Sequence, residues 1–502
     1  MLDAVLKRAW TARNGILGAS QGAIVVATDP EADACTFADT RTARCARCQG
    51  YLGVSILRMT SRLTSCLVLL ALGSGCGDNS AGSDSGADST VGDAPLGKDT
   101  SPSDGPVAND ASGDASASDA GASDAGSDGC PQGTYVDISA GQDGGSGTYP
   151  SAVIDTINGK LLVVTQDGAN ANKPSLFRCN LDGTSCGHTD ISAGQGTSSG
   201  QSPSAVIDTV NSKLLVVTDD GANSDKPALF RCNLDGTSCA YVDISAGQGA
   251  NSGYNPSAVI DTTNGKLLAV TQNGANSNRS ALFRCNLDGT SCSYVDISAS
   301  HAGTSGMFPS ARVDSVNGKL LVVTQDSSNL QRPALFRCNL DGTSCTYSDL
   351  SANGQATCAG SAGPSAVIDS TNSKLLVVVG NLANNGKPAL VACGLDGTSC
   401  AYADLSAGQG AFSGNMASAV VDSAGGKLLA AAYNATSSNK PALYRCNLDG
   451  SACAYTDISA GQGPNSGLQP SAVLDAVNHV LLVAVQNGAN GGRPGLFTVC
   501  LP

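Results

Sequence analysis

Apolar and polar positions along most of this chain repeat in a unit of about 53 residues. In the copy that begins at Ser151, residues 151–155 are small or β-branched, and residues 160–166 form a continuous apolar run. Residues 174–179 and 186–192 follow, and turn-forming Gly, Asn or Asp residues lie between the runs. Short runs bounded by such residues are typical of β-strands. Each unit therefore predicts four antiparallel strands.

The link between the third and fourth predicted strands is the most constant part of the unit. Residues 179–186 read Cys-Asn-Leu-Asp-Gly-Thr-Ser-Cys, and this segment returns, in places slightly altered, in five later copies. Asp182-Gly183 is a strong two-residue turn signal in which both residues are expected to have positive φ. Such a turn places the two cysteines opposite one another, within disulfide reach. We therefore predict six hairpin disulfides: Cys179–Cys186, Cys232–Cys239, Cys285–Cys292, Cys338–Cys345, Cys393–Cys400 and Cys446–Cys453.

The number and size of the units predict the architecture. The first strand begins at seven places: Ser151, Ser204, Ser257, Ser310, Ser365, Ser418 and Ser471. Four strands in about 53 residues match a propeller blade better than a rung of a β-helix. We therefore predict an all-β fold over residues 130–502, a seven-bladed β-propeller of four-stranded antiparallel blades.

The two ends of the repeat region complement each other. The seventh unit stops after its third strand, at Cys500, while a spare fourth strand, residues 135–139, stands before the first unit. Pairing the spare strand with the last unit closes the ring and removes the exposed edge that an open array presents. The same pairing predicts a seventh disulfide between Cys130 and Cys500, although both cysteines are out of register with those of the other units.

Residues 59–76 resemble the signal segment of bacterial lipoproteins. A basic start precedes an apolar run at residues 67–72, and small residues lead from there to Cys76. The run is too short to span a bilayer as a permanent helix. The resemblance implies export and lipid modification of Cys76, although Gly73 stands where the lipoprotein family usually has Leu.

The chain upstream of this signal is interpreted as a leader, residues 1–58, that is either non-native or disordered, with translation starting at Met59. The alternative is a metal-binding tail built on Cys45 and Cys48, which lacks a second pair of ligands.

Residues 77–129 are almost entirely Asp, Ser, Gly and Ala. They hold eleven Asp and one Lys, and so account for most of the net charge of −14. A segment with so few apolar side chains cannot bury enough surface to offset its ordering entropy, so we predict a disordered, extended tether. The acidic balance of the chain disfavours nucleic-acid binding.

The cysteines indicate the compartment. Twenty cysteines, many of them in short pairs, are typical of an oxidising environment. The pairs have no further Cys or His beside them in the same unit, so we predict no metal site, and nothing in the sequence calls for a cofactor. Cys358 has no partner in the repeat and is predicted to be a free thiol.

Polar loop residues are the candidates for ligand binding. In a propeller, the loops between second and third strands share one face with the loops between blades. The first set carries a basic residue in every blade: Lys173, Lys226, Arg279, Arg332, Lys387, Lys440 and Arg493. The same loops carry Asp167, Asp220 and Asp326, with Asn in the other four blades. We nominate these residues as a ring that hydrogen-bonds a glycan or an anionic polymer.

The alternative for this ring is that Asn, Asp and Gly make turns and that the basic side chains are solvated or paired locally. Duplication reproduces such residues whether or not they bind. Aromatic platforms, which carbohydrate recognition normally adds, are represented by Tyr149, Tyr254 and Phe308 at similar loop positions.

The repeats hold few groups suited to catalysis. His188, His301 and His479 are the only histidines, and they occupy different positions in three blades. Sialidases are also built on rings of blades, but they use a Tyr–Glu pair, and Glu31 is the only Glu of this chain. One Asp near the end of the fourth strand recurs in every blade, which suits a structural role better than a single active site.

The order of signal, acidic tether and repeat propeller resembles that of bacterial surface lipoproteins over residues 59–502. This resemblance implies a lipid anchor at the outer membrane or cell surface, or secretion without it. We predict a non-catalytic, envelope-anchored propeller that binds a glycan or a cell-surface protein through its loop face. The alternatives are a secreted hydrolase or lyase on the same scaffold, which non-repeated carboxylates near one end of the channel would favour, and a purely structural envelope component.

Overall fold

The computed structural model describes residues 36–39, 42–44, 133–298, 301, 303–358 and 363–502. The chain divides into two units, Met1–Ser116 and Ala117–Pro502. In the first unit, β1 (Thr36–Asp39) pairs antiparallel with β2 (Thr42–Arg44). The signal segment 59–76 and the tether 77–129 lie outside the described residues, as does most of the leader, so these assignments stay predictions.

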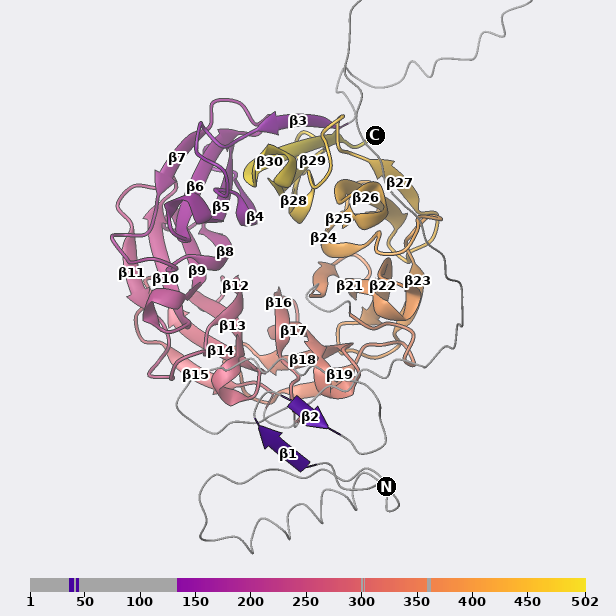
Figure 1. Ribbon diagram of the computed structural model, residues 1–502, viewed down its shortest axis with the longest axis horizontal. Coiled ribbons are helices and arrows are strands. Elements are labelled where there is room, and N and C mark those ends of the chain that lie inside the picture. The colour runs from indigo at the N-terminus through magenta and orange to yellow at the C-terminus, as the bar shows by residue number, and fades with distance from the viewer. Residues whose placement is uncertain (1–35, 40–41, 45–132, 299–300, 302, 359–362) are drawn as a thin grey trace, which may run out of the picture. The chain divides into compact units, whose positions relative to one another are not determined.

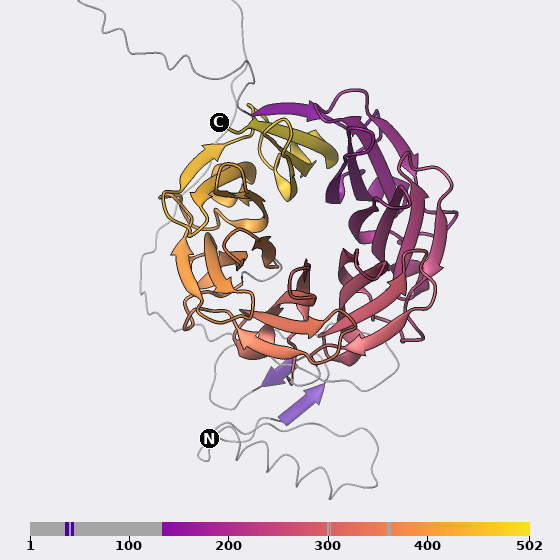
Figure 2. The ribbon, with the colours of Figure 1, turned by 180° about the vertical axis from the view of Figure 1, so that it is seen from behind.

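The second unit contains seven four-stranded antiparallel sheets that follow one another around a ring (Figure 1). In each sheet the strands succeed one another from the axis of the ring to its rim, and the same ring is seen from behind in Figure 2. The predicted seven-bladed β-propeller is therefore confirmed.

The blades have the following strands, from the innermost outward. Blade 1 holds β4 (Thr148–Asp155), β5 (Lys160–Asp167), β6 (Lys173–Asn180) and β7 (Gly187–Asp190); blade 2 holds β8 (Gln201–Asp208), β9 (Lys213–Asp220), β10 (Lys226–Asn233) and β11 (Ala240–Asp243). Blade 3 holds β12 (Tyr254–Asp261), β13 (Lys266–Asn273), β14 (Arg279–Asn286) and β15 (Ser293–Asp296); blade 4 holds β16 (Met307–Asp314), β17 (Lys319–Asp326), β18 (Arg332–Asn339) and β19 (Thr346–Asp349). Blade 5 holds β20 (Ser365–Asp369), β21 (Lys374–Asn381), β22 (Lys387–Gly394) and β23 (Ala401–Asp404); blade 6 holds β24 (Asn415–Asp422), β25 (Lys427–Asn434), β26 (Lys440–Asn447) and β27 (Ala454–Asp457). Blade 7 holds β28 (Leu468–Asp475), β29 (Val480–Asn487), β30 (Arg493–Cys500) and β3 (Thr134–Asp137).

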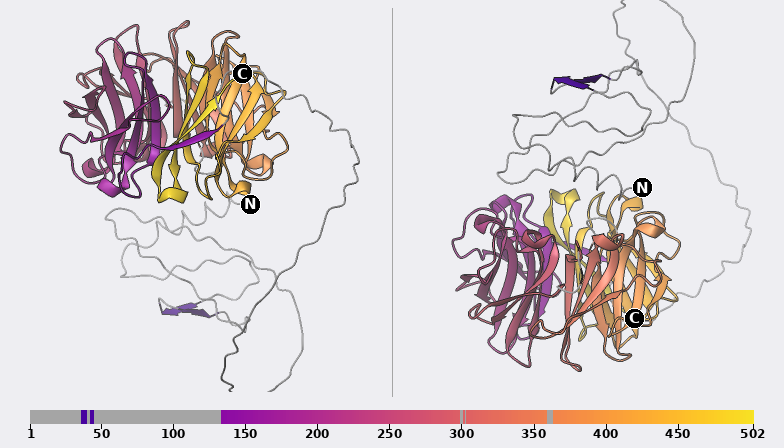
Figure 3. Two further views of the ribbon diagram at one scale, coloured as in Figure 1. Left: turned by 90° about the horizontal axis from the view of Figure 1, so that it is seen from above. Right: turned by 90° about the horizontal axis from the view of Figure 1, so that it is seen from below.

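A short 3-10 turn joins the second strand of each blade to the third. These turns are η1 (Gly168–Asn170), η2 (Gly221–Asn223), η3 (Gly274–Asn276), η4 (Ser327–Asn329), η5 (Leu382–Asn384), η6 (Ala435–Ser437) and η7 (Gly488–Asn490). We call the end of the ring that carries η1–η7 and the blade-to-blade connections the loop face; Figure 3 shows the turns gathered there. The opposite end, with the turns between first and second strands and the disulfide hairpins, is the hairpin face.

The N-terminal strand closes the ring, as predicted. β3 pairs antiparallel with β30, with Tyr135 opposite Phe497 and Val136 opposite Leu496. The rings of Tyr135 and Phe497 lie 5.1 Å apart, and the fourth and third strands of blades 2, 3, 4 and 6 make the same kind of contact. Cys500 is disulfide-bonded, and its predicted partner Cys130 lies outside the described residues.

All six predicted hairpin disulfides are present, but the turn that they enclose differs from the prediction. In blade 1, Gly183 has φ +80°, whereas Asp182 is not among the residues with positive φ. The Gly183 N–H donates to the Asn180 carbonyl, and Asp182 Oδ1 accepts from Thr184 N at 2.9 Å. This local hydrogen bonding of the Asp side chain makes a four-residue turn that needs positive φ only at glycine. It still brings Cys179 and Cys186 together.

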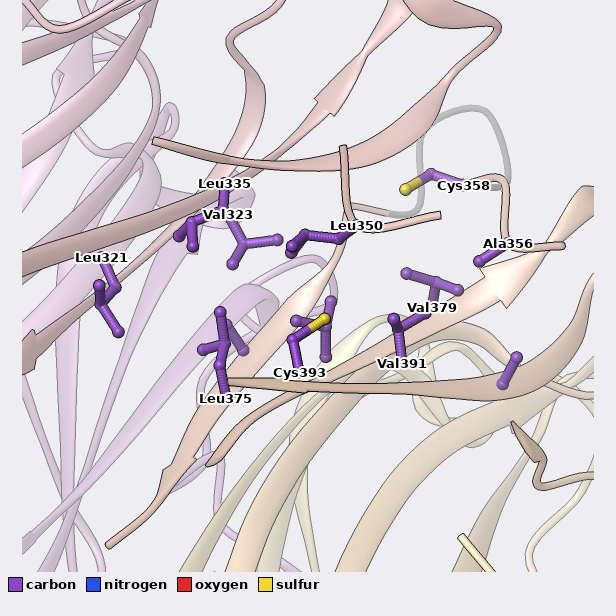
Figure 4. Packing of buried hydrophobic residues seen from close by; sticks show 13 residues of the cluster. Leu321, Val323, Leu335, Leu350, Ala356, Cys358, Leu375, Val379, Val391 and Cys393 are labelled. Atoms are coloured by element: carbon purple, nitrogen blue, oxygen red, sulfur yellow. The ribbon is translucent and has the colours of Figure 1, made fainter. Parts of the chain in front are cut away.

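The hydrophobic cores lie between blades. Seven clusters of buried residues each draw on two neighbouring blades, and one joins Leu482 and Leu496 of blade 7 to Phe177 and Ala152 of blade 1. Figure 4 shows the cluster between blades 4 and 5, in which Cys358 is buried. Cys358 is a free cysteine, as predicted, and burial raises the pKa of its thiol. Because each core needs two blades, the ring is a single cooperative structure.

A ring of seven hydrogen bonds ties the innermost strands together. The hydroxyl of the Ser that begins each predicted unit accepts the backbone N–H of the following Ala in the next blade, as Ser151 Oγ does from Ala205 N at 3.0 Å. The same bond joins every neighbouring pair, including blades 7 and 1 through Ser471 and Ala152. The Ser by which the seven units are counted in the sequence therefore makes a contact between neighbouring blades.

Candidate functional site

A cavity of about 480 Å³ lies at the loop-face end of the channel, and we call it the mouth. Each blade contributes two consecutive residues at the start of its inner strand: Tyr149-Pro150, Ser202-Pro203, Asn255-Pro256, Phe308-Pro309, Gly363-Pro364, Met416-Ala417 and Gln469-Pro470. Volumes of this size are usual for small-molecule sites. The mouth is thus the candidate binding site that the whole ring builds.

A bulge in the inner strand presents the first residue of each pair. In blade 1 the pairing of β4 with β5 shifts register between Thr148 and Ser151, and the other blades except blade 5 do the same. Bulges of this kind re-aim a side chain and are frequent near functional sites. The six bulged residues have φ between +46° and +52°, a conformation that bulky side chains rarely adopt.

A glycine anchors each bulge against the preceding blade. A Cβ added to Gly200 would lie 2.1 Å from Pro174 N, and one added to Gly253 would lie 2.4 Å from Pro227 N. Only glycine permits this approach, so the chain enters the six bulged inner strands from the same place. The bulged residue two positions after the glycine, such as Ser202 after Gly200, then lines the mouth.

The seven copies differ at the mouth. The first residues of the seven pairs are all different, as are the residues just before them, whereas the Ser and Ala that follow are the same in every blade. Exposure alone does not explain this variation. On the hairpin face, Val210 and Val477 are 86% and 87% exposed, yet this position holds only Ile, Val, Thr or Ala in the seven blades.

Three polar side chains of the mouth each keep one unused hydrogen-bonding group. Gln469 Oε1 accepts from Tyr149 N at 2.7 Å, which leaves the Gln469 amide nitrogen without a partner among the described residues. Asn255 Nδ2 donates to Gln272 Oε1, which leaves the Asn255 carbonyl oxygen. The Ser202 hydroxyl likewise has no partner among those residues. The mouth therefore offers a donor, an acceptor and a group that can do both.

Two aromatic side chains face the mouth from opposite parts of the ring. Tyr149 and Phe308 come from β4 and β16, which lie across the axis from one another in Figure 1. Tyr149 is 39% exposed. Phe308 packs on Gly363, where an added Cβ would lie 2.4 Å from the Phe308 Cβ. Gly363 thus leaves room for the aromatic ring and holds it in place.

The nominated basic residues lie at the first position of the third strand of each blade, outside the mouth: Lys173, Lys226, Arg279, Arg332, Lys387, Lys440 and Arg493. Two of them form ion pairs with the last residue of the outermost strand of their own blade. Arg279 lies 3.5 Å from Asp296, and Arg332 lies 3.2 Å from Asp349. Local pairing was the alternative weighed for these residues, and whether they also bind a ligand stays a prediction.

The nominated Asp167, Asp220 and Asp326 are at most 1% exposed and cap the 3-10 turns that follow them. Burial raises the pKa of Asp167, but hydrogen bonds led by those from His188 and Ser175 outweigh it, so this pKa lies below its ordinary value. Each of these three carboxylates accepts one or two backbone N–H groups of its 3-10 turn and so fixes the conformation of that part of the loop face. Their role in ligand binding stays a prediction.

One group resembles a catalytic triad in composition only. His301 Nε2 lies 2.9 Å from Asp326 Oδ2, and the Ser328 hydroxyl donates to the other oxygen of the same carboxylate. A triad needs one imidazole nitrogen on the serine and the other on the carboxylate. Here the same Nε2 faces both, at 3.5 Å from Ser328 Oγ, so His301 does not activate the serine.

A short sequence resembles the motif of a nucleophilic serine but does not lie in the structure that such a serine needs. Residues 196–200 read Gly-Thr-Ser-Ser-Gly, the order found at nucleophile elbows. Such an elbow requires a strand followed directly by a helix. Ser198 lies instead in the connection between blades 1 and 2, where its N–H donates to the Ala171 carbonyl.

Asp219 breaks the repeat beside the mouth. The other blades carry Gln, Gly or Tyr at its position, and in blades 1 and 3 that Gln accepts the backbone N–H of the next blade's mouth residue. Asp219 is 5% exposed, and its Oδ1 has no hydrogen-bond partner. Burial, followed by the charges of Asp225 and Asp220, raises its pKa to about 7.

The mouth residues were only partly found from the sequence. Tyr149 and Phe308 were noted as loop aromatics together with Tyr254, but Tyr254 lies one position earlier and donates its hydroxyl to Asn251 and Asp225 outside the mouth. Ser202, Asn255 and Gln469 were missed. Alignment of the seven copies would have narrowed the search to two adjacent positions that differ in every copy, of which the second lines the mouth.

The fold and this site define a seven-bladed β-propeller with a cavity, the mouth, on its axis. No protein-family model matches the chain, and no curated protein matches its sequence. Among solved structures, the WD40 repeats of RRP9 are 8% identical and match 74% of this chain and 99% of their own, with a TM-score of 0.47. An oligogalacturonate lyase from Vibrio parahaemolyticus is 12% identical over the same shares, with a TM-score of 0.46. A puromycin hydrolase is 13% identical over 71% of this chain and 54% of its own, with a TM-score of 0.45. Such distant likeness says nothing about what this chain binds.

The six disulfides fit an extracellular or exported protein. In the part of the chain that the structure describes, no helix has the length and apolar character needed to cross a membrane.

Proposed function

We propose that this protein is a non-catalytic binding propeller that holds a glycan or a cell-surface protein on its loop face, with the mouth as the centre of the site. The observation that supports it most strongly is the variation of the mouth residues. The seven blades share one framework, and each contributes a different side chain to the same cavity. Together these side chains give the mouth an asymmetric set of polar and aromatic groups.

The test blocks the mouth and leaves the fold intact. Ser202→Trp puts a large side chain into the mouth at a backbone conformation that already carries Tyr149 and Phe308 in other blades. Val210→Trp, on the exposed hairpin face of the same blade, is the matched control. We expect the full chain to bind members of an array of glycans, cell-wall polymers and surface proteins, and Ser202→Trp alone to abolish that binding. No binding across the array, or equal binding by both variants, would refute the proposal.

A hydrolase or lyase is the second candidate, because Asp219 is a non-repeated carboxylate with a raised pKa near one end of the channel. Its burial and the lack of any acidic residue among those that line the mouth argue for binding instead. Product release from any bound polymer, lost in Asp219→Asn, would support the enzyme.

We also propose that the propeller is exported and held at the envelope by lipid on Cys76. The disulfides support export, and the signal-like segment supports the lipid. We expect Cys76→Ser to move the protein from the membrane fraction to the medium, measured by fractionation and by incorporation of labelled fatty acid. Retention of both lipid and membrane association in the variant would contradict it.

A further inference from the structure

We infer that the mouth binds the uncharged end of an oligosaccharide chain, and this inference rests on the proposed function. None of the fourteen residues that line the mouth carries a charge. A charged ligand entering this partly enclosed site would lose hydration without gaining an opposite charge, which is strongly unfavourable. The mouth therefore selects a neutral ligand, although the chain as a whole is acidic.

The unused polar groups match sugar hydroxyls. A hydroxyl both donates and accepts hydrogen bonds, so it can pair with the Gln469 amide nitrogen, the Asn255 carbonyl oxygen or the Ser202 hydroxyl. The side chains of Gln469 and Asn255 are held through their other polar atoms, by Tyr149 N and Gln272. The protein thus positions these two groups before the ligand arrives, which lowers the entropic cost of binding.

The aromatic side chains match the apolar faces of a sugar ring. Tyr149 and Phe308 flank the two polar residues contributed by blades 2 and 3, Ser202 and Asn255. A sugar ring has C–H groups on its faces and hydroxyls around its edge. It would stack on an aromatic ring and direct its edge to the amide and hydroxyl groups between them.

The nearest charge on the inner strands of this side of the ring is Arg312, where all six other blades have Val. It lies four residues beyond Phe308 on β16, roughly 13 Å deeper along an extended strand, and donates to the Ala311 carbonyl at 2.7 Å. It does not line the mouth. A terminal sugar seated between Tyr149 and Phe308 would not reach it.

The test compares ligand classes on the full, oxidised chain. The probes are short neutral oligosaccharides of glucose, mannose and N-acetylglucosamine, uronic-acid and sulfated oligosaccharides of matched length, and peptides. We expect binding by neutral sugars alone, with an affinity that is insensitive to ionic strength because no charge pair forms. Binding confined to anionic sugars or to peptides, with sensitivity to Ser202→Trp, would overturn this inference and leave the proposed function standing. No binding to any probe would overturn both.

Single substitutions test whether Tyr149 and Phe308 are the residues on which the sugar stacks. Tyr149→Ala and Phe308→Ala each should weaken neutral-sugar binding by roughly tenfold or more, as expected when a stacking platform is lost. Phe412→Ala is the matched control, since Phe412 is an exposed aromatic with φ +55° outside the mouth. This control should bind as the parent protein does, with an unchanged melting temperature; a loss in it as large as that in Tyr149→Ala would overturn the assignment.

Discussion

Bulky side chains occupy backbone positions at the mouth that usually favour Gly or Asn. Tyr149, Phe308 and Met416 have φ between +47° and +49°. Strain of this kind costs on the order of 1–3 kcal/mol for each residue and persists where function or the surrounding structure requires it. In the disulfide hairpins the non-glycine residues with positive φ are small: Ser185, Ser238, Ser291, Ser344, Ser399 and Ala452. At the mouth, in contrast, three blades place a large side chain in this conformation.

Asp219 makes stability depend on pH. Its pKa in the folded protein, about 7, exceeds its ordinary value of 3.8, so the folded state holds a proton that the unfolded state releases. Stability therefore falls as pH rises from about 4 to 7 and stays low above that range. Asp219→Asn, which keeps the shape without the charge, should stabilise the protein above pH 7 by up to about 4 kcal/mol and have little effect below pH 4.

Denaturant unfolding of both proteins at several pH values measures this difference. Asp243→Asn is the control, because burial is outweighed there by hydrogen bonds led by that from Ser245, and the pKa of Asp243 is lowered. This control should not be stabilised at high pH. A difference between Asp219→Asn and the parent that is the same at all pH values would contradict the raised pKa.

The inner strand tolerates a bulge for a simple reason. It is the edge of its sheet, paired only with the second strand, so an extra residue disturbs one ladder and leaves the rest of the blade regular. The outer hairpin is the opposite case, since a disulfide encloses eight residues and stabilises each hairpin by about 2.5 kcal/mol on the chain-entropy account. Each blade is thus regular at its rim and variable at its axis.

Ring closure depends on one short strand. β3 pairs with blade 7 through four residues, and Cys500 of that blade is disulfide-bonded, whereas the fourth strand of every other blade follows its neighbour directly in the chain. Tyr135→Ala should therefore speed unfolding more than Tyr241→Ala, the same position in blade 2. Each loses one aromatic contact, worth roughly 1–3 kcal/mol for a half-buried ring.

Stopped-flow unfolding in denaturant compares the two variants. Tyr135→Ala should unfold faster than Tyr241→Ala. The ratio of the two unfolding rates should be larger than their difference in the free energy of unfolding accounts for, because opening of the ring exposes the cores on both sides of blade 7. Equal unfolding rates, or faster unfolding of Tyr241→Ala, would show that closure is not the weak point.

The sequence by itself determined the number of blades, the order of their strands, the closing strand and the six hairpin disulfides. The number of blades follows from counting the repeat units. The strands, turns and hairpin disulfides follow from apolar runs, turn residues and cysteine spacing, which all lie within one unit. The turn inside the hairpin was predicted in the wrong conformation, because the side chain of Asp182 hydrogen-bonds locally and the residue keeps an ordinary φ.

Only the tertiary structure decided which loop residues meet. Tyr149 lies two residues before Ser151 and Tyr254 three before Ser257. Only the bulged backbone shows what this offset means, since it places Tyr149 in the mouth and Tyr254 against Asp225. The basic ring and the capping carboxylates were prominent because they repeat, whereas the mouth was inconspicuous because it does not. A site on the axis of a ring is built by seven segments far apart in the chain, and no pattern within one unit contains it.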